Sequence, residues 1–499
     1  MDIQFEKVVL PCIQTVLQEV KEQEKSGEIK LIDEMPDIGR IIMSWGQVLL
    51  RGKEWRGDAV GLNSGIMVWV LYEPEEGGAP GCAQTWMPLQ MNWDMENTDR
   101  DGNVIFQPLL KALDVRAVSA RKMAVRASVG VQAIAQLPSE VVANRPVEVP
   151  EDIHVLDADY IVSIPMESGE KMFAVEEQLE LPGDIPELDT VVSYCVHPTV
   201  AEQKIMGDKL ILRGTSDLHL VYLSQEGAVC SWDFSMPYSQ YTQLDREYSG
   251  NAEAMILPVI TALELEKSED GKLSWKVGIC AQFTVYDKTA VSVVSDAYSN
   301  QRELTCRVEA LNLPSVLCRE TVALEPVQRM DFEGVRTADA MFYPDHPRVN
   351  STENGFKVDL SGVFRLVGYD NTGKLCSSVK KWETVHTISA ASDCIQSAQV
   401  IPGGKITTIF TGAGTELRCQ LPLALTTISG RGIPMVTQLA GAQEKEKDPG
   451  RPALVIKRVG EMSLWEHAKL SGSTVEAIRE VNGVGQELTG DKMLLIPVE

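Results

Sequence analysis

Apolar and polar residues alternate along most of the chain, and turn residues interrupt the alternation at short intervals. Runs such as 208-DKLILRG-214 and 218-LHLVYL-223 place an apolar side chain at nearly every second position. This period of two is typical of a strand with one buried face. Short strands separated by glycine-rich turns favour an antiparallel sandwich or a barrel-like unit. The pattern therefore predicts a mainly β protein.

The pattern recurs with a period of about 150 residues, which predicts three tandem copies of one unit. The proline and glycine landmarks are 21 positions apart in the first two copies, and the glycine and tyrosine are 15, 15 and 14 positions apart. These landmarks are Pro36, Gly57 and Tyr72 in the first copy, Pro186, Gly207 and Tyr222 in the second, and Gly355 and Tyr369 in the third.

Each copy also has a cysteine followed by a tryptophan, which predicts a repeated contact in the core. These residues are Cys82, Cys230 and Cys376, with Trp86, Trp232 and Trp382. Two similar alternating segments, 173–182 and 305–314, end at proline and precede the second and third copies. We expect each to pair with a sheet edge and to join one copy to the next, which would protect that edge from aggregation.

The remaining segments differ in composition from the copies. Residues 13–28 predict a short amphipathic helix ending at Gly27, and the charged stretch before residue 453 predicts a flexible tether. The expected organisation is an N-terminal helical segment (1–27), a repeat (28–140), a connector (141–184), a repeat (185–300), a connector (301–330), a repeat (331–438), a linker (439–452) and a C-terminal module (453–499).

The C-terminal module predicts the order strand, helix, helix, strand. The strands are expected at 453–459 and 492–497, and the first helix begins at Leu464. Ser473 and Glu476 have the spacing of a capping box, which predicts the second helix over 474–481. We expect Trp465 to anchor the module's small core.

Composition narrows the possible functions. Lys and Arg number 46 against 71 Asp and Glu, a net charge of −25 that repels nucleic acids and anionic lipid surfaces. The N-terminus lacks the basic region of a secretory signal, and no apolar run is long enough for a membrane span. The ten cysteines form no CxxC pair, which favours reduced thiols in the cytoplasm and no metal site. No catalytic motif or cofactor site is recognisable.

The C-terminal module resembles a LysM domain. The resemblance rests on Leu464-Trp465, Ala468, Thr474-Val475, Ile478, Asn482, Gly490 and Leu495-Ile496-Pro497. It implies binding through two loops, commonly to glycans that contain N-acetylglucosamine. Where the family usually has Gly-Asp-Thr, this chain has Glu461-Met462-Ser463, which favours a protein ligand. The candidate partner-binding residues are Glu461, Met462, Ser463, Leu464, Trp465, Asn482, Gly483 and Val484, of which Trp465 is favoured as core.

The repeats resemble the SPOCS domain of spore-forming bacteria, most closely over 186–299 and least in the third copy. Repeats of this type followed by LysM resemble SipL-type spore coat assembly proteins. The resemblance implies a non-enzymatic scaffold in the mother-cell cytoplasm, docked through LysM to a coat-morphogenetic ATPase on the forespore surface. Two alternatives remain: a peptidoglycan-binding protein, which would need export, and a wall hydrolase targeted by LysM.

Overall fold

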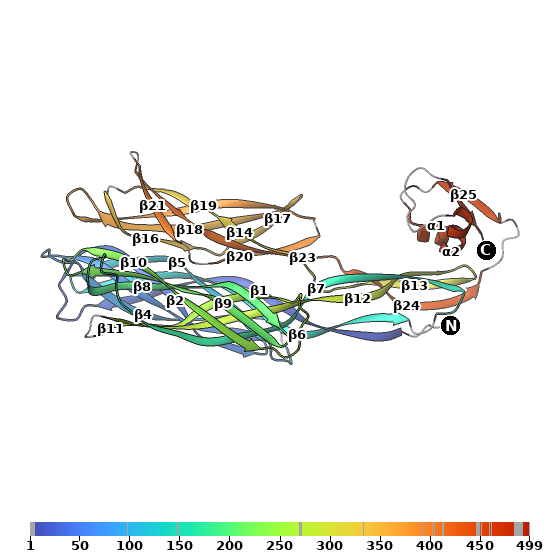
Figure 1. The fold of residues 1–499 in the computed structure, drawn as a ribbon, viewed down its shortest axis with the longest axis horizontal. Helices are drawn as coiled ribbons and strands as arrows, with labels where there is room; N and C mark the ends of the chain where they lie inside the picture. The colour runs from blue at the N-terminus through green and yellow to red at the C-terminus, as the bar shows by residue number, and fades with distance from the viewer. Residues whose placement is uncertain are drawn as a thin grey trace.

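The computed structural model is built almost entirely of antiparallel strands (Figure 1). It describes residues 5–96, 98–146, 149–268, 272–332, 334–391, 393–401, 403, 405–411, 414–445, 450, 452–458, 460, 462–483 and 493–498. The mainly β class predicted from the alternation is therefore confirmed.

The first repeat consists of two three-stranded sheets. Its strands are β1 (Phe5–Lys30), β2 (Ile38–Arg56), β3 (Ala59–Pro74), β4 (Gly81–Asp94), β5 (Asn103–Ser119) and β6 (Lys122–Pro146). One sheet has the order β2-β3-β4, and the other has the order β1-β6-β5.

The second repeat has the same topology, with sheets β8-β9-β10 and β7-β12-β11. Its strands are β7 (Ile153–Leu179), β8 (Leu188–Met206), β9 (Lys209–Ser224), β10 (Val229–Gln243), β11 (Glu253–Lys267) and β12 (Leu273–Ser299). The tyrosine landmarks serve the same purpose in both repeats, because the Tyr72 and Tyr222 hydroxyls donate to the carbonyls of Pro36 and Pro186 over 3.0 and 2.9 Å.

The third repeat divides the first strand of its first sheet into β16 and β17, and it also divides the long strands of the second sheet. Its strands are β13 (Arg302–Leu311), β14 (Val316–Leu324), β15 (Val327–Met330), β16 (Arg336–Pro344), β17 (Arg348–Thr352), β18 (Gly355–Tyr369), β19 (Leu375–Ser389), β20 (Cys394–Val400), β21 (Ile406–Thr411), β22 (Gly414–Cys419), β23 (Leu421–Ser429) and β24 (Ile433–Glu444). β18 is central to the first sheet, and the second is divided into β13-β24, β14-β23-β20 and β15-β22-β21.

Several predicted boundaries are wrong, because the segments outside the expected copies are strands of the repeats themselves. The predicted N-terminal helix is β1, which pairs with β6 along its whole length. A β-bulge between Thr15 and Leu17 adds one residue to the strand, so its apolar positions have helix-like spacing. The predicted connectors contain the end of β6 and the whole of β7, β13, β14 and β15. Segments 173–182 and 305–314 lie largely in β7 and β13, so the expectation that they pair at a sheet edge is confirmed. The start of the predicted linker, 439–444, belongs to β24, because it pairs with β13.

The repeated cysteine and tryptophan are not a uniform core contact. All three cysteines are half-buried, and Trp382 is buried, but Trp86 is 38% exposed. Trp86 lies on the outer face of β4, where the Arg51 guanidinium covers its ring. The alternation of β4 therefore directs this side chain outward, and a cation–π contact compensates for the lost burial.

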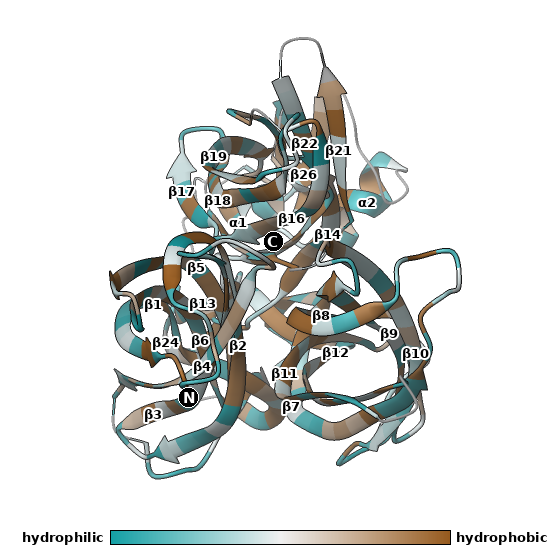
Figure 2. Cartoon of the chain, turned by 90° about the vertical axis from the view of Figure 1, so that its left-hand side faces the viewer, coloured by the Kyte–Doolittle hydropathy of each residue, from teal (hydrophilic) through white to brown (hydrophobic). Residues whose placement is uncertain are grey.

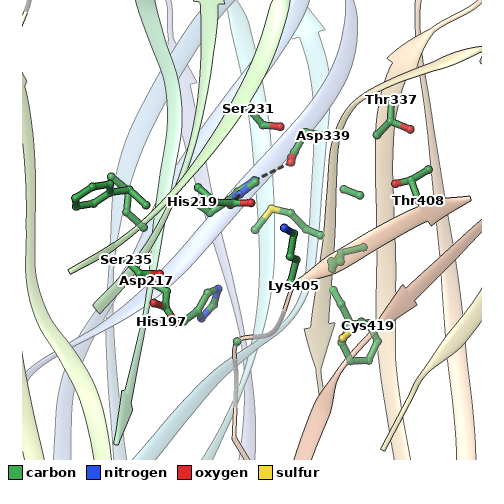
Figure 3. Close-up of a pocket in the computed structure, with 18 of the residues that line it drawn as sticks. His197, Asp217, His219, Ser231, Ser235, Thr337, Asp339, Lys405, Thr408 and Cys419 are labelled. Atoms are coloured by element: carbon green, nitrogen blue, oxygen red, sulfur yellow. Dashed lines mark hydrogen bonds and ion pairs between the residues drawn. The ribbon is translucent and has the colours of Figure 1, made fainter. Parts of the chain in front are cut away.

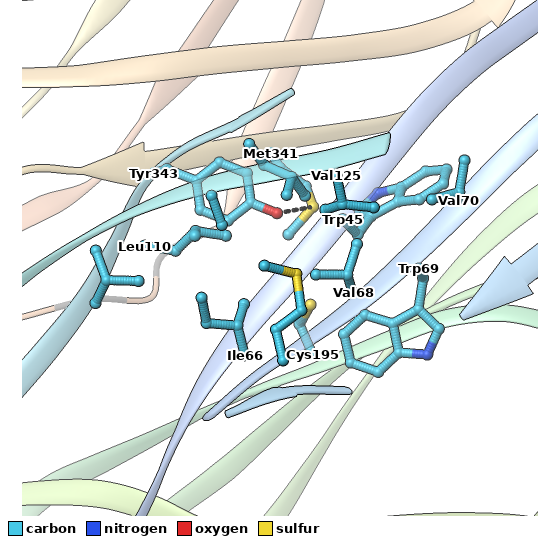
Figure 4. Packing of buried hydrophobic residues seen from close by; sticks show 14 of the residues in the cluster. Trp45, Ile66, Val68, Trp69, Val70, Leu110, Val125, Cys195, Met341 and Tyr343 are labelled. Carbon is cyan, nitrogen blue, oxygen red and sulfur yellow. Dashed lines mark hydrogen bonds between the residues drawn. The ribbon is translucent and has the colours of Figure 1, made fainter. Parts of the chain in front are cut away.

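The three repeats close into a ring, which is visible in the view along the long axis (Figure 2). Strands β3 and β9 carry equivalent residues, Trp69 and His219, at two of the junctions. The junction contacts are the Trp69 ring against Tyr194 at 5.0 Å, His219 Nε2 with Asp339 Oδ1 at 2.7 Å, and the Arg365 guanidinium with Ser44 Oγ at 3.0 Å. One large apolar core spans all three repeats, and Figure 4 shows Cys195 and Met341 packed among side chains of the first repeat.

The ends of the strand pairs β1–β6, β7–β12 and β13–β24 project together beyond the body as an arm (Figure 1). All three repeats contribute to its core, which contains Leu10, Cys12, Ala143, Val162, Ile164, Val291, Val293, Leu311, Leu313, Ile433 and Met435. Shared burial makes the arm one packed unit rather than three separate strand pairs.

The C-terminal module lies beside the arm (Figure 1). It consists of β25 (Leu454–Arg458), α1 (Leu464–Ser471), α2 (Val475–Asn482) and β26 (Met493–Pro497), which is the element order expected from the sequence. Ala468, Ile478, Leu494 and Ile496 form its core.

Candidate functional site

One residue of the first predicted loop, Ser463, caps the N-terminus of α1. Ser463 is the N-cap, and its Oγ accepts a hydrogen bond from the backbone N–H of Glu466 over 3.2 Å. The Glu466 carboxylate accepts from the Ser463 N–H over 2.7 Å, which completes a capping box. The box predicted at Ser473 and Glu476 is wrong, because α2 is capped by the neighbouring Thr474.

The second predicted loop begins with residues that hold the module together. The Asn482 amide donates to the carbonyls of Ile478 and Leu495 and accepts from the Leu495 N–H. Gly483 ends α2 with a left-handed φ of 60°, a conformation that costs glycine little. Asn482 and Gly483 therefore hold the frame of the module, and their role as partner contacts stays a prediction.

Trp465 contacts the arm rather than only the module's own core. Its ring packs edge-on against Tyr298 of β12 at 4.7 Å, and its Nε1 donates to Asp296 over 2.8 Å. Lys469, one turn along α1, donates to both oxygens of the same carboxylate over 2.7 Å. Burial acts to raise the pKa of Asp296, but the bonds from Lys469 and Trp465 outweigh it and lower that pKa.

Tyr298 completes the core of the module. Its side chain is buried with Ala468 and Ile478, and its hydroxyl donates to the Ser473 carbonyl over 2.9 Å. An aromatic residue of the second repeat thus occupies a core position in the module, which sequence reasoning on the module alone missed. Of the eight predicted residues, Met462 is exposed and Leu464 half-buried, whereas Glu461 and Val484 lie outside the described residues.

A second candidate site is a polar cavity of about 490 Å³ between the second and third repeats (Figure 3). One wall is the sheet β8-β9-β10, and the other comes from β16 and β21. Directly opposite residues on the three strands of the first wall form two polar rows, His197-Asp217-Ser235 and Cys195-His219-Asp233. The alternation of Asp217 and His219 with leucines in β9 was the available sequence signal, but it did not reveal which surface they face.

His219 is held between two carboxylates. Its Nδ1 is 2.6 Å from Asp233, its Nε2 is 2.7 Å from Asp339, and Asp339 also accepts from Trp45 Nε1 over 2.7 Å. Burial lowers the pKa of His219, but Asp339 and Asp233 outweigh it and raise the pKa to about 10. A protonated His219 thus links residues of all three repeats.

The row His197-Asp217-Ser235 has the residue types of a serine hydrolase but the wrong order. Asp217 lies on the middle strand, so His197 and Ser235 are separated by two strand spacings, roughly 10 Å. A general base must lie within about 3 Å of the hydroxyl that it activates. The row therefore does not support nucleophilic chemistry.

The two cavity histidines predict stability that falls on both sides of about pH 6.5. Because the pKa of His219 is raised, its protonated form stabilises the fold. This stabilisation is complete below pH 6.5 and is lost as the pH rises toward 10. Burial lowers the pKa of His197 to about 4, so the fold favours the neutral ring. The contribution of the neutral ring to stability is present above pH 6.5 and is lost as the pH falls from 6.5 to 4. Urea unfolding between pH 4 and 8 measures both limbs before buried thiols titrate. His219→Leu should flatten the limb above pH 6.5 and His197→Gln the limb below it; unchanged limbs would contradict the assignment.

Among the described residues, no group of three or more His, Cys, Asp or Glu side chains is placed to hold a metal ion. None of the helices in the described part of the chain is long and apolar enough to cross a membrane. A scan against models of protein families, a search of curated proteins and a search of solved structures each find no match to this chain. Its function must therefore be inferred from its own residues and their geometry.

Proposed function

We propose that this chain is a non-enzymatic scaffold for spore coat assembly. In this proposal the C-terminal module, a LysM-type domain, docks to a coat-morphogenetic ATPase on the forespore surface in the mother-cell cytoplasm. The observation that carries the proposal is the position of the module, which is attached to a packed arm by Trp465, Lys469 and Tyr298. Fixing the module before it meets its partner reduces the ordering entropy that binding would cost.

The same attachment changes how the scaffold would work. A flexible tether raises the local concentration of a module, but a docked module is also held in one orientation. The three SPOCS-type repeats would then set both the reach and the direction of the docking surface. In this mechanism the repeats have a structural role and no catalytic role.

Met462 is the sharpest point at which to test the proposal. Its side chain is exposed, and it directly precedes Ser463, the N-cap of α1. We expect Met462→Asp to weaken binding of the full chain to the purified ATPase at least tenfold, because a charge would have to be desolvated at the contact. Biolayer interferometry measures the effect, and Leu464→Ala should weaken binding in the same direction.

Leu470→Asp serves as a matched control, because Leu470 is an apolar residue of α1 that is 67% exposed and lies outside the predicted loops. It should bind like wild type. If Met462→Asp and Leu464→Ala also bind like wild type, the loop is not the docking surface. Saturable binding of the full chain to chitin oligomers or peptidoglycan, with none to the ATPase, would favour the glycan-binding alternative.

A further inference from the structure

The cavity between the second and third repeats contains one carboxylate, Asp217, that is not paired with any other described residue. Asp233 and Asp339 are both paired with His219. The Asp217 carboxylate lines the same cavity, and it forms no hydrogen bond or ion pair with any other described residue. The Asp217 side chain is half-buried, so its negative charge faces the cavity and is available to a cation or a hydrogen-bond donor there. Asp217 therefore marks the cavity as a place for a positively charged group.

The residues around Asp217 favour a donor of several hydrogen bonds. His197 and Ser235 are directly opposite it on the neighbouring strands, where side chains lie about 5 Å apart. Both offer acceptor atoms, since burial keeps the His197 ring neutral near pH 7 by lowering its pKa to about 4. An ammonium group has three N–H donors and no acceptor, which matches a carboxylate flanked by an imidazole and a hydroxyl.

The charge of the whole cavity points the same way. Three carboxylates, those of Asp217, Asp233 and Asp339, line it against two cations, His219 and Lys405. One negative charge is left over when His219 is protonated. The aromatic rings of Phe234 and Phe342 also line the wall, and ring faces attract ammonium groups.

A second feature indicates unoccupied binding capacity. The Thr337 hydroxyl lines the cavity from the third repeat, and its oxygen is buried without a hydrogen-bond partner among the described residues. Unpartnered buried hydroxyls are uncommon in folded proteins and need an explanation. A bound polar molecule would supply the missing partner.

The cavity also has an apolar extension. A smaller cavity of about 110 Å³ at the meeting point of the three repeats shares part of the same wall. The shared lining residues are His197, Met341, Phe342, Pro344 and Gly403, and the apolar residues added by the extension include Val48, Leu109, Val259 and Ile260. A side chain at position 403 would meet His197 Cβ at 2.9 Å, so Gly403 keeps the backbone close to the polar end.

From these features we propose that the cavity binds a small primary ammonium compound with an apolar body, with Asp217 as its counter-ion. The ammonium group lies in the row formed by His197, Asp217 and Ser235, and the apolar body extends toward Met341 and Phe342. The cavity volume is within the range of sites for small molecules, roughly 300–1,000 Å³. This site is independent of the C-terminal module and of the partner proposed for it.

The test uses the full chain and matched probes. 3-Methylbutylamine supplies the ammonium group and an apolar stem, 3-methylbutanol lacks only the charge, and leucine adds a carboxylate that Lys405 would face. Isothermal titration calorimetry should show saturable binding of the amine, with the alcohol at least tenfold weaker. Leucine binding as well as the amine or better would support the same assignment, since both carry the ammonium group.

Asp217→Asn should weaken the amine at least tenfold while leaving the alcohol unchanged, because only the charged ligand needs the carboxylate. Asp99→Asn, in an exposed turn of the first repeat, is the matched control and should bind the amine like wild type. Circular dichroism and thermal unfolding verify that both variants are folded. Equal affinity for amine and alcohol, absence of saturable amine binding by the folded wild type, or unchanged amine binding by Asp217→Asn would each overturn the proposal.

Discussion

Replacing His219 with leucine should lower the free energy of unfolding by about 3–5 kcal/mol, the range observed when one partner of a buried ion pair is removed. The side chain of Asp339 is only 2% exposed, and it would retain only the hydrogen bond from Trp45. Leucine fills a similar volume, so the loss reports the missing charge and hydrogen bonds rather than a cavity. Urea unfolding at pH 6.5, followed by circular dichroism, measures it.

Asp233→Asn is the matched control on the other side of the imidazole. The Asp233 side chain is 66% exposed, so water solvates it and its pairing with His219 contributes only about 0–1 kcal/mol. A His219→Leu variant that loses no more stability than Asp233→Asn would show that the junction between the second and third repeats does not depend on this charge. The other contacts of that junction would then hold it without this charge.

The repeat was readable from the sequence because its landmarks have local functions. The Tyr72 and Tyr222 hydroxyls donate to Pro36 and Pro186, so in the first two repeats the same spacing corresponds to the same hydrogen bond within the repeat. Boundaries were less predictable. The bulge between Thr15 and Leu17 moved apolar residues to helix-like positions, and only pairing with β6 identifies the segment as a strand.

The capping box shows a different limit. Two serines in the module, Ser463 and Ser473, each precede a glutamate by three residues, so both satisfy the pattern. The second is not used, because Thr474 takes the cap of α2 while the carbonyl of Ser473 receives the Tyr298 hydroxyl. The contact with Tyr298 of the second repeat, which is remote in sequence, therefore accompanies the use of Thr474 rather than Ser473 as the N-cap of α2.

The cavity was beyond sequence reasoning for a related reason. Alternation in β9 places Asp217 and His219 on one face, and strand order gives their neighbours within the sheet. Asp339 belongs to the next repeat, and its pairing with His219 depends on how the ring closes. The three junctions use an aromatic pair, an ion pair and an arginine at related positions, so no shared motif predicts them.

Tyr298→Ala should release the C-terminal module while leaving the repeats folded. Truncating a buried aromatic residue costs about 3–5 kcal/mol, and here that loss falls on the contact between the arm and the module. Hydrogen exchange measured by mass spectrometry should show protection of α1 and α2 falling by about 100-fold or more, at roughly 1.4 kcal/mol for each factor of ten. Protection of β3 and β9 should remain unchanged.

Tyr298→Phe separates the hydroxyl from the ring. It removes the hydrogen bond to the Ser473 carbonyl and keeps the buried ring, so we expect a loss of about 1 kcal/mol and a module that stays docked. Equal exchange of α1 in wild type and Tyr298→Ala would show that the module's core does not need the arm.

The same variant decides what the arm contributes to docking. If the arm only carries the module, a released but folded module should bind the ATPase proposed as its partner as tightly as wild type. If the arm orients the module, Tyr298→Ala should weaken that binding even though Met462 and the rest of the first loop are intact. The reason is that binding must then order a module that the arm no longer holds, which costs entropy. Since Asp296 and Tyr298 are only two positions apart on β12, Asp296→Ala should shift binding in the same direction by a smaller amount, having lost the contacts to Trp465 and Lys469 but kept the buried ring.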